Sequence, residues 1–177
     1  VLPAAQVDIF AVKNFIENQV TTPNFTPNVI IIDYDANLIT HSKEMYQGGE
    51  EIYNAATAIA RPATGSGRLV FIASQPKIGY WDYSEIPKEA AAESSRKQAI
   101  VDVMITIGRN PAILETQAGI MLIAKMRHGR EGETAFYRLD EGHFRMIDRN
   151  LYSSLIVSGG ARRDGAVDMR HKKFNRK

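Results

Sequence analysis

The sequence predicts an α/β protein in which a parallel sheet is extended by antiparallel strands toward the C-terminus. Two observations predict this class. In the first half, short runs of β-branched and apolar residues, typical of buried strands, alternate with amphipathic helical segments. In the second half, strand-like runs follow one another without helices between them, as in antiparallel hairpins.

The composition fits one globular domain. The chain has 177 residues, is 44% hydrophobic and 24% charged, and can therefore bury a core. It has no cysteine, which excludes disulfides, thiolate metal sites and cysteine nucleophiles and fits a reducing cytosol. No apolar run approaches the roughly 20 residues of a membrane span. Because the first residue is Val1, we expect the chain to begin inside a longer protein or after processing.

The net charge of +2 is unevenly distributed. Residues 161–177 carry seven Lys and Arg residues against two Asp residues, with few apolar residues and no periodicity. We therefore expect residues 149–177 to form a basic, flexible tail that follows a domain at 1–148. Such a tail is either a disordered solubilising segment or an arm that touches nucleic acid or another acidic surface.

The first half of the chain predicts two helices and two strands. Apolar residues recur at helical spacing in residues 7–20, and two prolines in 21–28 end that helix. Four consecutive β-branched residues, Val29 to Ile32, predict a strand that is buried on both faces. The remaining segments are a polar loop at 41–49, a helix at 50–60, a turn at 64–67 and a second buried strand at 68–75.

The second half predicts mainly strands. Residues 76–87 contain the single tryptophan and two tyrosines and are expected to form a long loop. The other predicted elements are a short helix at 88–98, strands at 101–108 and 119–126, and a hairpin whose strands at 134–139 and 143–147 flank residues 140–142.

Polar side chains stand at the ends of the two buried strands. Asp33 follows the first strand, and Ser74 and Gln75 end the second. Ligands of parallel sheets bind at the carboxyl ends of the strands, so Asp33 is well placed for Mg²⁺ and a nucleotide phosphate. The neutral amide of Gln75 can bond a phosphate oxygen or an attacking water. The alternative is that these are ordinary turn residues at strand ends.

Two cations follow the fourth predicted strand. Lys125 and Arg127 alternate with Met126 at strand spacing and therefore point to the same face. Two neighbouring cations repel each other unless they meet an anion, and a γ-phosphate is a suitable one. The alternative is a pair of solvated charges at a strand end.

Together these motifs resemble the C-terminal part of a DnaB-type replicative DNA helicase, over residues 5–148. The match is to five motifs in the same order. Residues 29–34 resemble the family's Walker B strand, 74–75 its Ser-Gln strand end, 93–102 its Glu-Ser-Gly-Ser-Ile-Glu-Gln-Asp-Ala-Asp segment, 125–129 its Lys-Gln-Arg-Asn-Gly segment, and 134–147 its closing hairpin. The spacing before the Walker B strand is most similar to phage versions.

The sequence also departs from the family. Ser95 replaces a glycine and Gln98 an acid of the family segment, while Arg96 and Lys97 add charge where the family is apolar or neutral. The 177 residues contain no Gly-x-x-x-x-Gly-Lys-Ser/Thr loop, and the family's catalytic glutamate also lies upstream of anything present.

The resemblance implies part of a RecA-like P-loop ATPase core that uses ATP and Mg²⁺. In that scheme Asp33 holds Mg²⁺ through water, and Gln75 senses the γ-phosphate. Lys125 and Arg127, the latter as an arginine finger, reach the ATP of a neighbouring subunit. The P-loop comes from an upstream segment, so we expect the chain alone to be inactive.

The resemblance also implies partners and a location. The DNA-binding residues it indicates are Lys77, Glu93, Ser94, Arg96 and Lys97, and the ligand is single-stranded DNA. The expected assembly is a hexameric ring, with a primase or a helicase loader as further partners and no membrane. The expected location is the cytoplasm, that of a bacterial host cell if the chain is encoded by a phage.

Two alternatives to a helicase remain open at this point. One is a non-catalytic RecA-fold module that binds DNA or acts as a scaffold docked on a complete helicase. The other is a recombinase-like RecA-fold ATPase, which would exchange strands rather than unwind them.

Overall fold

The structure is a computed structural model that describes residues 7–20, 25–42, 45–63, 65–90, 95–108, 116–140 and 142–160. Its helices are α1 (Ile9–Val20), α2 (Met45–Ala60), α3 (Ser95–Ile100) and α5 (Arg149–Gly160), with 3₁₀ turns η1 (Asp35–Asn37), η2 (Ile78–Tyr80) and η3 (Lys88–Ala90). Its strands are β1 (Val29–Ile32), β2 (Leu69–Ile72), β3 (Val103–Gly108), β4 (Ala118–Met126), β5 (Thr134–Asp140) and β6 (His143–Ile147).

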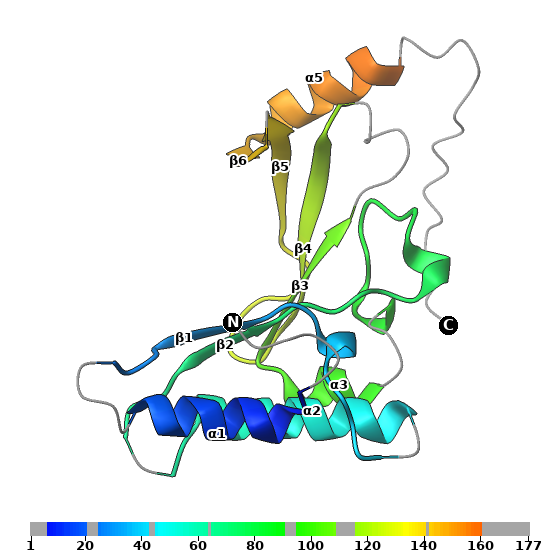
Figure 1. The fold of residues 1–177 in the computed structure, drawn as a ribbon. Helices are drawn as coiled ribbons and strands as arrows, with labels where there is room; N and C mark the ends of the chain where they lie inside the picture. The colour runs from blue at the N-terminus through cyan, green and yellow to red at the C-terminus, as the bar shows by residue number, and fades with distance from the viewer. Residues whose placement is uncertain are drawn as a thin grey trace.

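The predicted fold class is confirmed. Strands β1 and β2 pair in parallel, and β3, β4, β5 and β6 form an antiparallel sheet in that order. Within the described residues the two sheets are separate in their hydrogen bonding. Helices α1 and α2 lie side by side along the β1–β2 sheet, whereas the antiparallel sheet rises away from them and carries α5 at its far end (Figure 1).

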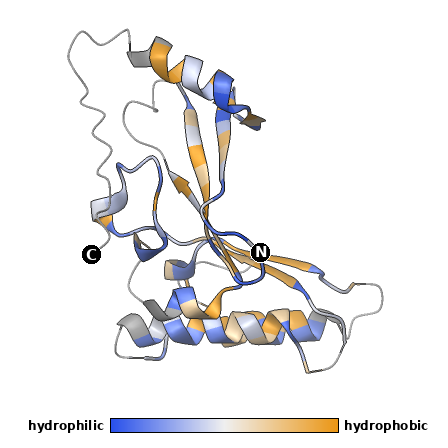
Figure 2. Cartoon of the chain, turned by 180° about the vertical axis from the view of Figure 1, so that it is seen from behind, coloured by the Kyte–Doolittle hydropathy of each residue, from blue (hydrophilic) through white to orange (hydrophobic). Residues whose placement is uncertain are grey.

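The core lies between the β1–β2 sheet and the two long helices. It contains Ile9 and Ile16 of α1, Ile32 of β1, and Ala55 and Ile59 of α2. Alternate residues of both strands, Ile30, Val70 and Ile72, pack against this cluster because successive strand side chains point to opposite faces. Figure 2 shows that the strands are largely hydrophobic along their length.

The prediction that β1 is buried on both faces is wrong for the part of the chain that the structure describes. Val29 and Ile31 of β1 are 54% and 73% exposed, and Leu69 and Phe71 of β2 are 53% and 51% exposed. All four point to the face opposite α1 and α2, which no described element covers. The continuous apolar sequence therefore reflects a face that is open here.

Two boundaries differ from the prediction. The polar segment 41–49 is not all loop, because α2 already begins at Met45. Its glycines belong to the helix: a Cβ on Gly49 would lie 2.6 Å from Cε of Lys97, and one on Gly48 would lie 2.7 Å from Oγ1 of Thr40. The predicted helix at 88–98 is replaced by η3 and α3.

The predicted tail begins too early. Residues 149–160 form helix α5, and Asp148 is its N-cap: its Oδ1 accepts the backbone N–H of Leu151 at 2.8 Å. Tyr152 packs on Phe136 of β5, with ring centroids 4.6 Å apart. Residues 161–177, with most of the predicted positive charge, lie outside the described residues.

The predicted hairpin is confirmed by the pairing of Asp140 with His143. Gly142 has a φ of +83°, a left-handed conformation that suits glycine in the connecting turn. In the part of the chain that the structure describes, no helix combines the length and the apolar character that a membrane span requires.

Candidate functional site

The carboxyl ends of β1 and β2 bring two of the predicted site residues to one edge of a sheet. The strands pair in register, with Ile32 opposite Ile72, and the N–H of Ala73 donates to the carbonyl of Ile32 at 2.9 Å. Asp33 and Gln75 follow directly after this last pair and are both exposed. The expectation that they share the carboxyl edge of a parallel pair is therefore confirmed.

Asp33 presents a single carboxylate to solvent. Its backbone carbonyl accepts the side-chain amide of Asn37 at 3.3 Å. Among the described residues, no group of three or more His, Asp or Glu side chains gathers as a metal site. This arrangement fits Mg²⁺, which keeps several waters and commonly takes only one or two protein carboxylates beside substrate phosphates.

The side chain of Gln75 makes no hydrogen bond to the described residues and is exposed beyond the end of β2. Its amide can therefore reach a ligand at this edge without breaking a bond within the chain. An amide both donates and accepts, so it can bond either a phosphate oxygen or a water.

A buried cluster lies directly beneath this edge, and the sequence did not predict it. Asp35 is 5% exposed, and its Oδ2 atom accepts three bonds: from Nζ of Lys97 at 2.9 Å, from Oγ of Ser74 at 2.8 Å and from the hydroxyl of Tyr53 at 3.2 Å. These donors come from α3, from the end of β2 and from α2. One carboxylate oxygen therefore joins three parts of the fold at the candidate site.

The cluster is strongly coupled electrostatically. Lys97 is 4% exposed, and its Nζ lies 5.4 Å from the centre of the Tyr53 ring. Burial raises the pKa of Tyr53 well above its usual range, and the negative charge of Asp35 raises it further. Tyr53 therefore stays protonated and donates to Asp35.

The position of Lys97 removes it from the set of residues that can touch DNA in this structure. Its ammonium is buried against Asp35, so it presents no charge to a phosphate. The signal in the sequence was the charge at a position where the resembling segment is apolar. A buried lysine needs a carboxylate partner, and Asp35, only two residues after Asp33, supplies it.

Lys125 and Arg127 converge on the C-terminal end of α3. Nζ of Lys125 donates to the carbonyl of Val101 at 2.8 Å and also contacts that of Gln98. The guanidinium of Arg127 donates to the carbonyls of Ala99 at 3.1 Å and Ile100 at 3.0 Å. The two cations thus tolerate each other because unpaired carbonyls and the negative end of the helix dipole face them.

Arg127 also takes part in an exposed ion-pair network. Its Nη1 lies 3.2 Å from Asp102, which pairs with Arg61 at 2.5 Å on its other oxygen. The hydrogen bond from Arg61 holds the pKa of Asp102 below its usual value, and the charges of Arg61 and Arg127 contribute. None of the described contacts of Lys125 or Arg127 involves Asp33 or Gln75.

The remaining residues predicted to bind DNA are only partly described. Lys77 is exposed, and its Nζ donates to the carbonyl of Glu89 at 3.3 Å. Glu93, Ser94 and the side chain of Arg96 lie outside the described residues.

The loop after Lys77 carries exposed aromatic and apolar side chains. Trp81 is 53% exposed while its Nε1 donates to the carbonyl of Pro76 at 2.9 Å. Ile78 is 78% exposed, and the rings of Tyr80 and Tyr83 meet edge to face. This loop is therefore suited to bases or to an apolar partner surface.

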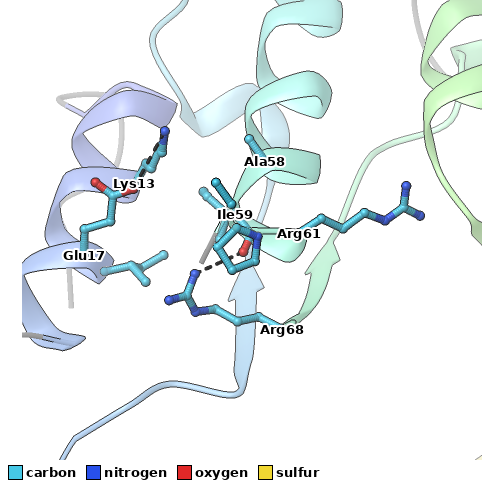
Figure 3. A pocket seen from close by; sticks show the side chains of 9 residues that line it. Lys13, Glu17, Ala58, Ile59, Arg61 and Arg68 are labelled. Carbon is cyan, nitrogen blue, oxygen red and sulfur yellow. Dashed lines mark hydrogen bonds and ion pairs between the residues drawn. The ribbon is translucent and has the colours of Figure 1, made fainter. Parts of the chain in front are cut away.

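A cavity of about 520 Å³ lies at the other end of the β1–β2 sheet, among the residues that α1, α2 and the start of β2 contribute. Figure 3 shows Lys13 and Glu17 on one side and Arg61 and Arg68 on the other. Arg68 donates to the carbonyl of Ile59 at 3.2 Å just before β2 begins. The cavity is thus remote from the carboxyl edge and is not part of the candidate site.

Comparisons with known proteins address the fold. No protein-family model matches the sequence, and no curated protein matches it. The solved ATPase domain of one DnaB-like replicative helicase superposes with a TM-score of 0.66 at 16% identity, covering 80% of this chain and 52% of that chain. A second DnaB-like replicative helicase, described with its interactions with primase, superposes with a TM-score of 0.67 at 16% identity.

The second superposition covers 80% of this chain and 35% of the helicase chain. The present chain therefore spans about half of the first structure and about a third of the second. Together the two superpositions show that this chain has the fold of DnaB-like replicative helicase ATPase domains, the RecA-like fold that its sequence motifs predicted.

Proposed function

We propose that this chain is part of the motor domain of a ring-shaped replicative DNA helicase, which couples ATP hydrolysis to movement on single-stranded DNA and to duplex unwinding. The observation that carries the proposal is the carboxyl edge of β1 and β2. Within a fold shared with DnaB-like helicase ATPase domains, Asp33 and Gln75 stand there side by side in sequence register, exposed and ready for a ligand.

In this proposal the edge binds the phosphates of ATP. Asp33 holds Mg²⁺ through water, and the ion neutralises charge on the transferring phosphoryl group. Gln75 bonds the γ-phosphate or the attacking water and thereby registers whether the γ-phosphate is present. Both roles use side chains that the described part of the chain leaves free.

A further segment supplies the P-loop and the general base. Support comes from the open face of the β1–β2 sheet, because parallel sheets are normally covered on both faces. It also comes from the first superposition, in which nearly half of the solved ATPase domain has no counterpart here. The 177-residue chain alone is therefore proposed to hydrolyse essentially no ATP.

Lys125 and Arg127 are proposed to act on the ATP of a neighbouring subunit. Arg127 is 36% exposed in its side chain and borders the surface, so a phosphate can replace its carbonyl partners. A guanidinium there stabilises charge that develops on the transferring phosphoryl group. The absence of described contacts to Asp33 is consistent with a role in trans.

DNA is proposed to bind along the loops beyond the carboxyl edge. Lys77 offers a phosphate contact, and Trp81 and Tyr83 offer rings for stacking. Arg96, Glu93 and Ser94 remain proposed contacts. Phosphate contacts of this kind make binding independent of sequence and sensitive to salt.

A non-catalytic scaffold is the second candidate, and one observation favours it. Lys125 and Arg127 already bond the carboxyl end of α3 within their own chain, as they would in a purely structural role. In a scaffold, no ligand would ever replace these carbonyls.

The test is ATP hydrolysis and fork unwinding by the complete protein that contains this chain. The helicase proposal expects hydrolysis that single-stranded DNA stimulates, together with unwinding of a forked duplex. Asp33→Asn serves as the matched variant, since it removes one negative charge at constant shape. Retention of hydrolysis and unwinding in Asp33→Asn would refute the assigned site, and a complete protein inactive in both assays would favour the scaffold.

A further inference from the structure

Lys97 joins helix α3 to the strand ends that carry Asp33 and Gln75. Its ammonium is held by Asp35 at 2.9 Å, and both side chains are at most 6% exposed. The stem of Lys97 passes over α2 at Gly49, where a Cβ would lie 2.6 Å from Cε. The lysine thus crosses between α2 and α3 along a path that only a glycine leaves open.

Asp35 connects this lysine to both strands. Its backbone N–H donates to the carbonyl of Ala73 at 3.0 Å, which fixes η1 to the end of β2. Its Oδ2 accepts the hydroxyl of Ser74, the residue before Gln75. A shift of Lys97 therefore acts on the backbone that positions Gln75 and on the turn that follows Asp33.

Helix α3 is held at its other end by Lys125 and Arg127. Their bonds reach the carbonyls of residues 98–101, so the six-residue helix is gripped at both ends. The result is a continuous set of polar contacts from Arg127, through α3 and Lys97, to Asp35 and Ser74.

We propose that Lys97 is a positioning residue that transmits the state of Arg127 to Gln75. When Arg127 leaves the carbonyls of α3 for a neighbouring nucleotide, α3 shifts and Lys97 carries the shift to Asp35. The assignment of Gln75 and Arg127 to nucleotide sites rests on the proposed function, but the mechanical link does not. Buried ion pairs suit this role because water cannot take the place of either partner.

The first test measures the link in the chain itself, without ATP or DNA. Hydrogen exchange is followed at the amides of Asp35 and Ala73, which bond across the two strand ends. In the wild-type background we expect Arg127→Ala to speed their exchange by roughly tenfold. In the Asp35→Asn/Lys97→Met background, the same change is expected to alter it by less than about twofold.

Asp35→Asn keeps an oxygen that accepts the hydroxyls of Ser74 and Tyr53, so this pair of changes removes the tie to α3 and little else. Equal acceleration in both backgrounds, or none in the wild type, would overturn the proposal. Ser74→Ala keeps the ion pair and serves if the double variant does not fold: it is expected to reduce the acceleration at Ala73. Acceleration unchanged by Ser74→Ala would likewise count against the link. Lys13→Ala/Glu17→Ala, which removes an exposed pair on α1, should change nothing.

The second test uses the complete ATPase. Asp35→Asn/Lys97→Met is expected to lower the stimulation of kcat by single-stranded DNA by roughly tenfold while KM for ATP stays within about twofold. Loss through mere unfolding would instead remove nucleotide binding. If the wild-type protein hydrolyses no ATP, the proposed function fails while the exchange result still decides whether Lys97 transmits the shift. Undiminished stimulation in the double variant would contradict the positioning role.

Discussion

The buried pair of Lys97 and Asp35 gives the sharpest prediction about stability. Lys97→Met would leave the carboxylate of Asp35, with its side chain only 6% exposed, without its cationic partner. Breaking a buried ion pair in this way costs about 3–5 kcal/mol. Two hydroxyl donors, from Tyr53 and Ser74, still bond the remaining carboxylate, so we expect the lower end, about 3 kcal/mol.

Urea denaturation measures this loss directly. For a slope of about 2 kcal/mol/M, a loss of about 3 kcal/mol lowers the urea midpoint by about 1.5 M. Asp35→Asn/Lys97→Met removes both charges, and we expect it to recover about 2 kcal/mol of the loss, because no unpaired charge then remains buried. Lys88→Met serves as the control: it breaks an ion pair with Glu131 whose partners are 40% and 42% exposed, and its midpoint should match the wild type.

Two results would refute the reasoning. If the double variant were as unstable as Lys97→Met, the loss would come from packing of the lysine stem rather than from the unpaired carboxylate. If Lys97→Met cost under about 1 kcal/mol, the pair would behave as an exposed one, in contradiction to its burial.

Three further predictions address neighbouring features. Gly49→Ala adds a methyl 2.6 Å from Cε of Lys97 and is expected to destabilise the fold by about 1–3 kcal/mol in a urea titration, whereas Gly79→Ala, whose methyl meets no atom within 4 Å, should have no such cost; the opposite order would contradict the packing of Lys97 on α2. Because Asp102 has a lowered pKa in the folded state, its contribution to stability is present above the unfolded value and is lost as the pH falls through the folded one; Arg61→Met should move the pKa of Asp102, followed by carboxyl NMR, back up toward 3.8, and no upward movement would deny the role of Arg61. Lys77→Ala is expected to weaken binding of single-stranded DNA by the complete protein and to lower the slope of log K against log salt by about 0.7, as one lost phosphate contact requires; an unchanged slope would remove Lys77 from the DNA path.

The sequence was sufficient for the order and type of most elements. The run Val29 to Ile32 indicates a buried parallel strand because it has no polar alternation, and it does pair in parallel with β2. The segments 134–139 and 143–147 alternate around a glycine turn and form the β5–β6 hairpin. The shared position of Asp33 and Gln75 followed from strand direction alone.

The sequence was misleading where local signals competed with tertiary contacts. Gly48 and Gly49 suggested a loop, but both lie inside α2, where neighbouring side chains leave no room for a Cβ. Helix α5 was missed because its N-cap, Asp148, sits before residues whose partner surface, Phe136 on β5, is visible only in the fold.

The buried cluster could not be derived from sequence because its members are far apart in the chain. Lys97 and Asp35 are separated by 62 positions, and only the fold brings them together. A charge at an apolar position of α3 was the one local sign, and it also suited a DNA contact. Burial decides between the two interpretations, and burial is a property of the whole fold.

The most direct test of the helicase account is the effect of Arg127→Ala on the complete protein, measured as steady-state ATP hydrolysis alongside equilibrium binding of ATP. If Arg127 stabilises the transition state in a neighbouring subunit, hydrolysis should fall by roughly 10³-fold or more while ATP binding stays close to wild type. Hydrolysis at the wild-type rate in Arg127→Ala would contradict the account and leave Arg127 as a cap on the end of α3.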